Sequence, residues 1–309
     1  MKSAPSAAGE FKRVRGSSWT LAYSFGFTAL AILFLLAVAG LFLWQSVPVW
    51  RHEGYHYLSG TRWFYRDHQF GSLPLLYGSA VVSSIALLLA APLGIGAGIF
   101  TSEYLPPRLR LGVKIAVELL AGIPSVVYGL LGILFLRNWV YRMLTPFDPL
   151  SGDTLLTAGL LLAVMVLPTV MTLSDDAFRA VPTAQRAAAR GLGLTRTESV
   201  FFISMPQAAP GVFAAVLLGL GRAFGETIAV FLVVGRQDNQ WTRNLLSLQP
   251  WIRAGQTLTS KLGGSEVNIA YGEPRHWAAI VGLGLILLVV VAAITVVGAQ
   301  LARRSSRHA

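Results

Sequence analysis

The chain lacks cysteine altogether and is poor in charge, because only 13% of its 309 residues are aspartate, glutamate, lysine or arginine. The absence of thiols excludes disulfide bonds, thiolate nucleophiles and cysteine-ligated metals. Histidine is scarce as well. His52 and His56 stand four residues apart, but they lie in a polar, aromatic stretch with no third ligand nearby, so we expect no metal site. No GxxxxGK(S/T) phosphate loop is found, which excludes that mode of ATP binding.

What the sequence does contain is long apolar runs. Hydrophobic residues make up 54% of the chain and are gathered in blocks, whereas a soluble domain has roughly 45–50%. A helix needs about 20 apolar residues to cross the hydrocarbon layer of a bilayer. Six blocks meet that length: residues 21–44, 75–100, 115–136, 155–173, 212–234 and 277–299. We therefore predict an all-α, polytopic membrane protein with about six transmembrane helices.

Basic residues predict how these helices are oriented. The net charge is +11, but lysine and arginine flank the apolar blocks, which favours topology and contact with membrane lipid over nucleic-acid binding. With both termini cytoplasmic, the inside segments carry 14 basic residues over 81 positions and the outside segments carry 10 over 90. The first apolar run is too long for a signal peptide, so we expect an uncleaved helix. The predicted parts are a cytoplasmic tail at 1–20, a transmembrane domain at 21–309, a cytoplasmic loop at 174–210, and external loops at 45–74, 137–154 and 235–276.

Residues 50–70, in the first external loop, are rich in tryptophan, tyrosine and phenylalanine. Tryptophan and tyrosine favour the level of the lipid headgroups, so interfacial anchoring is the preferred interpretation of this stretch. A docking surface for an external partner is the alternative.

The cytoplasmic loop at 174–210 begins with the local signals of a short helix. Thr183 can cap this helix, which runs through the alanines at 187–189. Gly191 and Gly193 should stop it, because glycine tolerates the left-handed C-cap conformation.

A second short helix should follow at once. Thr195 and Glu198 match a capping box, with threonine at the N-cap and glutamate three residues further on. This helix should end at Pro206. A helix–glycine–helix hairpin suits a lever that docks on a partner protein, and an interfacial helix lying on lipid is an alternative that these residues leave equally open.

The fifth apolar block contains charges that indicate a transport path. Arg222 and Glu226 are four residues apart, so on a helix they share one face and can pair near mid-membrane. A guanidinium binds an anion through two hydrogen bonds, and a passing anion could compete with Glu226 for Arg222. The alternative is a structural ion pair that bridges helices.

The third apolar block holds one further carboxylate and a pair of helix breakers. Glu118 lies about one turn inside the cytoplasmic end, where it either lines the path or snorkels to the surface. Gly122 and Pro124 should kink this helix and free backbone groups near the path. Plain packing accounts for the two breakers equally well.

The loop at 174–210 resembles the coupling loop of ABC importer permeases. Their pattern is Glu-Ala-Ala, three residues, Gly, nine residues, then Ile-x-Leu-Pro, and Gly193 takes the place of its glycine. Ala187 stands where the family usually has glutamate, a departure that bears on any salt bridge from this position to the ATPase. The resemblance assigns these residues to ATPase coupling: Ala188, Ala189, Gly191, Gly193, Thr195, Glu198, Ile203, Met205 and Pro206.

Two further stretches resemble the phosphate-specific permeases of the PstC type. They are Glu-Leu-Leu-Ala-Gly-Ile-Pro-Ser-Val-Val-Tyr-Gly at 118–129 and Gly-Leu-Gly-Arg-Ala-Phe-Gly-Glu-Thr-Ile-Ala-Val at 219–230. The sister permease, of the PstA type, usually continues Gly-Glu-Thr with Ala-Pro. The resemblance implies the fold of type I ABC importer permeases and a role as permease subunit of an ATP-driven phosphate importer. It places Arg222, Glu226 and Glu118 along the path.

The resemblance also implies partners and a location. We expect a PstA-type sister permease, two copies of an ATPase that uses ATP and Mg²⁺, an external phosphate-binding protein and the bacterial inner membrane, with no cofactor held by this chain. The rivals are a permease for sulfate, molybdate or phosphonate, the PstA-type sister itself and, in another class, a passive channel or secondary transporter. An enzyme would need a paired nucleophile and base, and Ser83 and Ser84 have no basic partner in sequence reach, so we expect a transport subunit and no enzyme.

Overall fold

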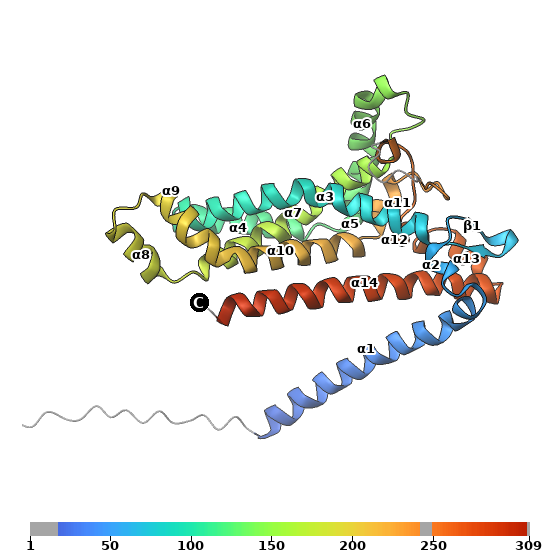
Figure 1. The fold of residues 1–309 in the computed structure, drawn as a ribbon, viewed down its shortest axis with the longest axis horizontal. Helices are drawn as coiled ribbons and strands as arrows, with labels where there is room; N and C mark the ends of the chain where they lie inside the picture. Colours follow the sequence, from blue (N-terminus) through green and yellow to red (C-terminus); the bar gives the residue numbers. More distant parts are fainter. Residues whose placement is uncertain (1–17, 242–248, 308–309) are drawn as a thin grey trace, which may run out of the picture. The chain divides into compact units, whose positions relative to one another are not determined.

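The computed structural model describes residues 18–241 and 249–307, which are helical almost throughout (Figure 1). The longer helices are α1 (Ser18–Glu53), α3 (Leu73–Ile99), α4 (Pro107–Ala121), α7 (Leu155–Arg179), α10 (Met205–Gly225) and α14 (Pro274–Arg307). The shorter ones are α2 (His56–Ser59), α5 (Ser125–Leu131), α6 (Arg137–Leu144), α8 (Thr183–Gly191), α9 (Arg196–Ser199), α11 (Ile228–Val233), α12 (Leu258–Leu262) and α13 (Glu266–Ala270). π-Helical turns follow α3, α5 and α9, at Phe100–Tyr104, Gly132–Leu136 and Val200–Ser204. Strands β1 (Trp63–Phe64) and β2 (Gln69–Phe70) pair antiparallel.

Contacts divide the chain into two units, residues 1–44 and 45–309. The first unit holds most of α1, which belongs to a stretch, Thr20–Glu53, long and apolar enough to cross a membrane. The predicted cytoplasmic tail at 1–20 falls almost wholly outside the described residues.

The second unit holds the other candidate membrane spans, and they confirm the prediction of about six transmembrane helices. Four are long single stretches: Leu73–Tyr104, Leu155–Arg179, Arg196–Gly225 and Pro274–Leu301. A sixth span for the chain is made if Pro107–Ala121 and Ser125–Phe147 count as one, and these two are bent against each other by 83°.

Two of the predicted spans are not the single helices that hydrophobicity suggests. The third breaks between α4 and α5, where Gly122 caps one helix and Pro124 precedes the next. Proline has no N–H and disfavours helix at the residue before it, which explains the break. The fifth, predicted at 212–234, starts earlier in the chain and breaks after Gly225, so α11 is a separate short helix.

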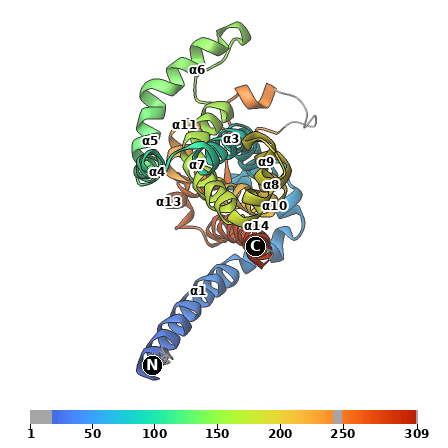
Figure 2. The same ribbon diagram turned by 90° about the vertical axis from the view of Figure 1, so that its left-hand side faces the viewer.

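Helices α3, α7 and α10 pack side by side and form the centre of the second unit (Figure 2). Glycines allow the close approach: a Cβ on Gly94 would lie 3.0 Å from the side chain of Val170, and one on Gly159 would lie 2.6 Å from Ile85. Small residues at such positions let helices pack backbone to backbone in a membrane, where van der Waals contact replaces the hydrophobic effect.

Gly98 offers a direct test of this packing. An added Cβ would lie 2.8 Å from the side chain of Ser174 and 3.0 Å from the backbone nitrogen of Asp175. We expect Gly98→Ala to lower the free energy of unfolding by about 1–3 kcal/mol through overpacking, measured as a lower melting temperature in detergent. Gly96→Ala is the matched control, since nothing lies within 4 Å of its Cβ position on the same helix. Equal melting temperatures for the two variants would contradict the α3–α7 interface described here.

The aromatic residues at 50–70 form part of a second core at the end of the unit opposite α8 and α9 (Figure 1). Tyr57, Trp63 and Phe70 are buried, and the Tyr57 hydroxyl donates a hydrogen bond to the carbonyl oxygen of Ala279 at 2.7 Å. For these three residues both interfacial anchoring and docking are therefore wrong, because their rings are buried in a core with α12, α13 and the start of α14. We refer to residues 56–70, α12 and α13 as the cap. Tyr55 and Phe64 remain exposed.

A network of charged groups around the buried Lys261 connects the cap to the start of α14. Lys261 is 1% exposed, lies 2.8 Å from a carboxylate oxygen of Asp238 and forms a second ion pair with Glu266. Glu266 also accepts hydrogen bonds from the indole of Trp63 at 2.6 Å and pairs with His276 at 2.8 Å. Burial acts to raise the pKa of Glu266, but the Lys261 charge and these hydrogen bonds outweigh it and lower the pKa. Glu266 is therefore ionised at neutral pH, and its negative charge is paired with the positive charge of Lys261.

Candidate functional site

The break between α10 and α11 determines what Glu226 can do. Glu226 has extended backbone angles, and its carboxylate accepts the backbone N–H of Ala229 at 3.3 Å. That N–H belongs to the first turn of α11, where helix donors have no partner within the helix. The predicted pairing of Arg222 with Glu226 on one helix face is wrong, because the helix ends at Gly225 before it reaches the glutamate.

Arg222 lies near the C-terminal end of α10 with its side chain exposed. Within residues 18–241 and 249–307, no hydrogen bond or ion pair to its guanidinium is found. The positive charge is therefore not neutralised by the described part of this chain, and it is available to an anion or to a neighbouring subunit.

Beside the break lies a narrow cleft with hydroxyl groups on its walls. It brings α3, the α10–α11 break and the start of α12 together, and its lining residues are Ser79, Val82, Ser83, Ala223, Phe224, Glu226, Val230, Thr257 and Thr259. Of the three residues predicted for the path, only Glu226 lines it. From the sequence, Ser83 is considered only as an enzyme nucleophile, and Ser79, Thr257 and Thr259 are not singled out, because hydroxyl residues are common and only the fold brings these four together.

Glu118 and the break in the third span lie elsewhere on the molecule. Glu118 is exposed on α4, and no ion pair to it is found among the described residues. Across the break, the hydroxyl of Tyr128 donates a 2.8 Å hydrogen bond to the carbonyl oxygen of Leu120. This bond satisfies one of the acceptors that the end of α4 leaves free.

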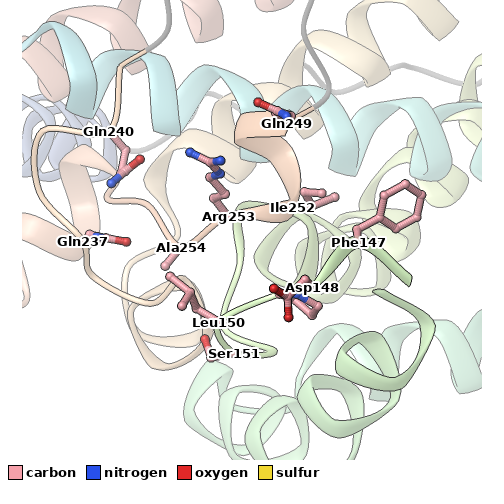
Figure 3. Close-up of a pocket in the computed structure, with 11 residues that line it drawn as sticks. Phe147, Asp148, Leu150, Ser151, Gln237, Gln240, Gln249, Ile252, Arg253 and Ala254 are labelled. Atoms are coloured by element: carbon pink, nitrogen blue, oxygen red, sulfur yellow. The ribbon is translucent and has the colours of Figure 1, made fainter. Parts of the chain in front are cut away.

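A larger cavity of about 400 Å³ opens between the turn after α6 and the segment before α12 (Figure 3). Arg253 extends between Gln240 and Gln249, and Gln237 lines the same cavity. None of the residues predicted from the sequence for the path or the coupling loop lines it.

The loop predicted as a hairpin does form one, from α8 and α9, and we refer to residues 183–199 as the hairpin. Its first helix ends as expected, because Gly193 has a positive φ of 87°. The N–H of Leu194 bonds to the carbonyl of Ala189 at 3.2 Å and that of Gly193 to Arg190 at 3.0 Å, the two bonds of a Schellman motif. The expected cap at the start is wrong, since Pro182 occupies the N-cap and Thr183 is already in the helix.

The second half of the hairpin combines one confirmed prediction and one correction. The capping box is present, with Thr195 and Glu198 each accepting from the backbone of the other. The predicted end at Pro206 is wrong, because a π-helical turn at Val200–Ser204 leads straight into α10. The π-turn widens the backbone just before Pro206, which has no N–H to donate to the preceding turn.

Both helices of the hairpin are attached to the end of α3. The guanidinium of Arg186 in α8 lies 3.0 Å from the carboxylate of Glu103, and it also donates to the carbonyl oxygen of Phe178. The Tyr104 hydroxyl donates a hydrogen bond to the hydroxyl of Thr197 in α9 at 3.2 Å, and Arg196 lies over the Tyr104 ring at 5.3 Å. The hairpin is thus attached to the end of α3 by these contacts, and it is continuous with α10.

The faces of the hairpin that point away from the helices include apolar residues. Leu192 is 83% exposed at the tip, and Ala187 and Ala188 are exposed on α8, whereas Ala189 is buried. Phe202, in the π-turn, is 69% exposed. An apolar tip of this kind is a surface for a partner or for lipid.

The amino-acid sequence of the chain is similar to a family of transport proteins and to several of its members. Residues 90–307 match the family described as binding-protein-dependent transport system inner membrane component. The chain is 34% identical over 284 residues to the phosphate transport system permease protein PstC of Mesorhizobium japonicum, covering 85% of this chain and 83% of that protein. It is 36% identical over 256 residues to the phosphate transport system permease protein PstC 1 of Mycobacterium tuberculosis, covering 78% of this chain and 74% of that protein.

Solved structures with the same fold are also known. The membrane subunit architecture is similar to a chain of the inward-facing MetNI methionine ABC transporter, with a TM-score of 0.55, 16% identity, and coverage of 74% of this chain and 93% of that one. It is also similar to a chain of a bacterial alginate ABC transporter, with a TM-score of 0.52, 16% identity, and coverage of 93% and 95%. At this identity the likeness concerns the fold alone.

Proposed function

This chain belongs to the family of binding-protein-dependent transport system inner membrane components, and on that premise we propose that it is the PstC-type permease subunit of an ATP-driven phosphate importer. The observation that carries the proposal is the identity of 34% to a PstC protein over 85% of the chain. The family name itself implies a transport system with a binding protein, and the ABC permease relatives imply an ATPase that is a separate subunit.

The finer assembly follows as part of the proposal. Two copies of the ATPase bind at the hairpin, a PstA-type sister permease completes the path, and an external phosphate-binding protein docks at the opposite end. Both termini then lie in the cytoplasm of a bacterium, and the loop at 174–210 faces the ATPase. The exposed apolar tip at Leu192 supports the hairpin as the docking element, because a partner would cover it.

The mechanism is alternating access between two states. Closure of the ATPase pair moves the hairpin, and the hairpin moves α10 and the end of α3, to which it is attached. The break at Gly225 and Glu226 lies at the far end of α10, so this movement changes the surroundings of Glu226 and Arg222. ATP and Mg²⁺ are used by the partner, and this chain makes and breaks no covalent bond.

Arg222 supplies the charge that receives the anion. Its guanidinium is exposed and has no partner within the described residues, and guanidinium groups bind phosphate through two parallel hydrogen bonds. Arg222→Ala should therefore lower ATP-dependent uptake of radiolabelled phosphate by roughly 10- to 100-fold, the loss expected for hydrogen bonds to a charged group. The assay uses the complete complex, co-expressed with its ATPase, sister permease and binding protein and reconstituted in vesicles, with sulfate as a second solute.

Arg142→Ala is the matched control, because Arg142 is also exposed but lies on α6, away from the break. Normal uptake by Arg222→Ala would remove Arg222 from the path and leave the permease assignment standing. Uptake without ATP dependence in a fully assembled wild-type complex would contradict the importer and favour a channel or secondary transporter.

A further inference from the structure

The cleft beside the α10–α11 break has an unusual supply of hydroxyl groups for a site inside a membrane protein. Ser79 and Ser83 come from α3, and Thr257 and Thr259 come from the start of α12. All four side chains are at least 95% buried. Buried polar groups in proteins are normally hydrogen-bonded, so their partners can be counted one by one.

The count leaves donors without acceptors. The hydroxyl oxygen of Ser79 accepts the N–H of Leu258 at 2.9 Å, but its own proton has no acceptor among the described residues. The Ser83 hydroxyl has no hydrogen-bond partner among the described residues. Thr257 and Thr259 lie 3.1 Å apart and share one proton, which leaves the other proton of the pair free. The cleft therefore presents three hydroxyl protons to whatever occupies it.

The same cleft presents one acceptor. One carboxylate oxygen of Glu226 accepts the N–H of Ala229 at 3.3 Å, and the other has no donor among the described residues. A carboxylate has no proton of its own to offer at its free oxygen, so it requires a donor from the ligand. Three donors and one acceptor at a single cleft are the complement of an oxyanion that still carries a proton.

We propose that this cleft is a phosphate subsite in which Glu226 accepts the P–OH proton of hydrogen phosphate while Ser79, Ser83 and the Thr257–Thr259 pair donate to its other oxygens. The proposal rests on the proposed function and adds the basis of selectivity. At neutral pH phosphate and arsenate keep at least one proton, whereas sulfate has none. Sulfate in the cleft would place an unprotonated oxygen against the carboxylate and lose affinity, because the two negative oxygens repel each other and neither has a proton to share.

The cleft is closed in this structure. It holds a cavity of about 10 Å³, which is about the room that a single water needs. The anion enters only when α11 or α12 moves away from α3, and alternating access supplies such a movement. Lys261, near the C-terminal end of α12, pairs with Asp238 and Glu266, and these contacts hold that end of the helix in place.

The test is equilibrium binding to the complete permease–ATPase complex in nanodiscs without the binding protein, measured both without nucleotide and with bound ATP so that both states of the access cycle are sampled. Radiolabelled phosphate is the probe, and arsenate and sulfate are the competitors. In the wild type, arsenate should displace phosphate and sulfate should not. In Glu226→Gln, sulfate should compete at least tenfold better than in the wild type, because the amide can donate an N–H to an unprotonated oxygen. Glu273→Gln is the control, since that carboxylate pairs with His68 outside the cleft and selectivity should not change.

Two hydroxyl variants keep the proposal testable if Glu226→Gln fails to assemble. Ser83→Ala and Thr259→Val should each weaken phosphate binding about tenfold, the loss expected for a hydrogen bond to a charged group. Unchanged sulfate competition in Glu226→Gln, unchanged phosphate affinity in both hydroxyl variants, or no saturable phosphate binding to the wild type would each overturn the subsite. The proposed function would survive all three results, since it is decided by ATP-dependent uptake.

Discussion

Lys261→Ala is expected to lower the free energy of unfolding of the chain by about 3 kcal/mol, the lower end of the cost of removing one partner from a buried ion pair, because the two remaining carboxylates are partly exposed. Lys261 is 1% exposed and is the shared cation of Asp238 and Glu266. Without it, two carboxylates are left near each other, and Glu266, which is 16% exposed, keeps only its contacts with Trp63 and His276. Thermal unfolding followed by tryptophan fluorescence measures the effect, and Trp63 is a local reporter because the Lys261 ammonium lies 5.2 Å from its ring.

Lys114→Ala is the matched control for this prediction. Lys114 also pairs with a carboxylate, Asp176, but the two side chains are 38% and 58% exposed and 3.9 Å apart. Pairs exposed to this degree contribute little to stability, so the control should unfold close to the wild type. Similar melting temperatures for Lys261→Ala and the control would mean that the network does not hold the cap in the folded protein.

Arg186→Ala is expected to uncouple ATP hydrolysis from transport. Arg186 and Glu103 are 16% and 8% exposed, and their ion pair attaches α8 to the end of α3. Without it, the hairpin can move with the ATPase while α3 stays behind. We expect a fall of about tenfold in phosphate uptake and in the ATP hydrolysis that loaded binding protein stimulates, as for loss of a charged hydrogen-bonded contact. Basal ATP hydrolysis should stay near the wild-type level.

A charge exchange separates this coupling role from simple damage to the fold. Arg186→Glu combined with Glu103→Arg restores the ion pair in reverse and should recover part of the uptake, whereas each single change should not. Arg108→Ala is the control, since Arg108 is exposed at the start of α4 and belongs to no ion pair found among the described residues. Loss of basal ATP hydrolysis in Arg186→Ala, or no recovery in the double variant, would assign the pair to assembly only.

The sequence predicts those parts of the fold that depend on local chemistry. Apolar length alone places the spans, and the Thr195–Glu198 capping box forms as expected because both of its bonds lie within four residues. The breaks are harder to predict. The apolar block runs on past Gly225 and Glu226 to residue 234, so a window of 20 residues places the end of the helix there and misses the break.

The contacts that define the site come from residues far apart in the chain. Tyr57 and Ala279 are 222 residues apart in the sequence, and a hydrogen bond between them turns an aromatic loop into a buried core. The cleft likewise combines Ser79, Glu226 and Thr257 from three separate segments. The resemblance to known permeases directs attention to Glu226, but the hydroxyl groups around it become visible only once the chain is folded.

One continuous helical stretch, Arg196–Gly225, joins the hairpin to the break between α10 and α11. It contains 30 residues, so its length is about 45 Å. If the helix that starts at Arg196 ended at Pro206, as the sequence predicts, a flexible joint would separate the hairpin from α10. Because the stretch has no break, we expect a shift of the hairpin to move the Gly225 end as well. If the hairpin binds the ATPase as proposed, the position of the Glu226 carboxylate would change with the nucleotide state of that partner.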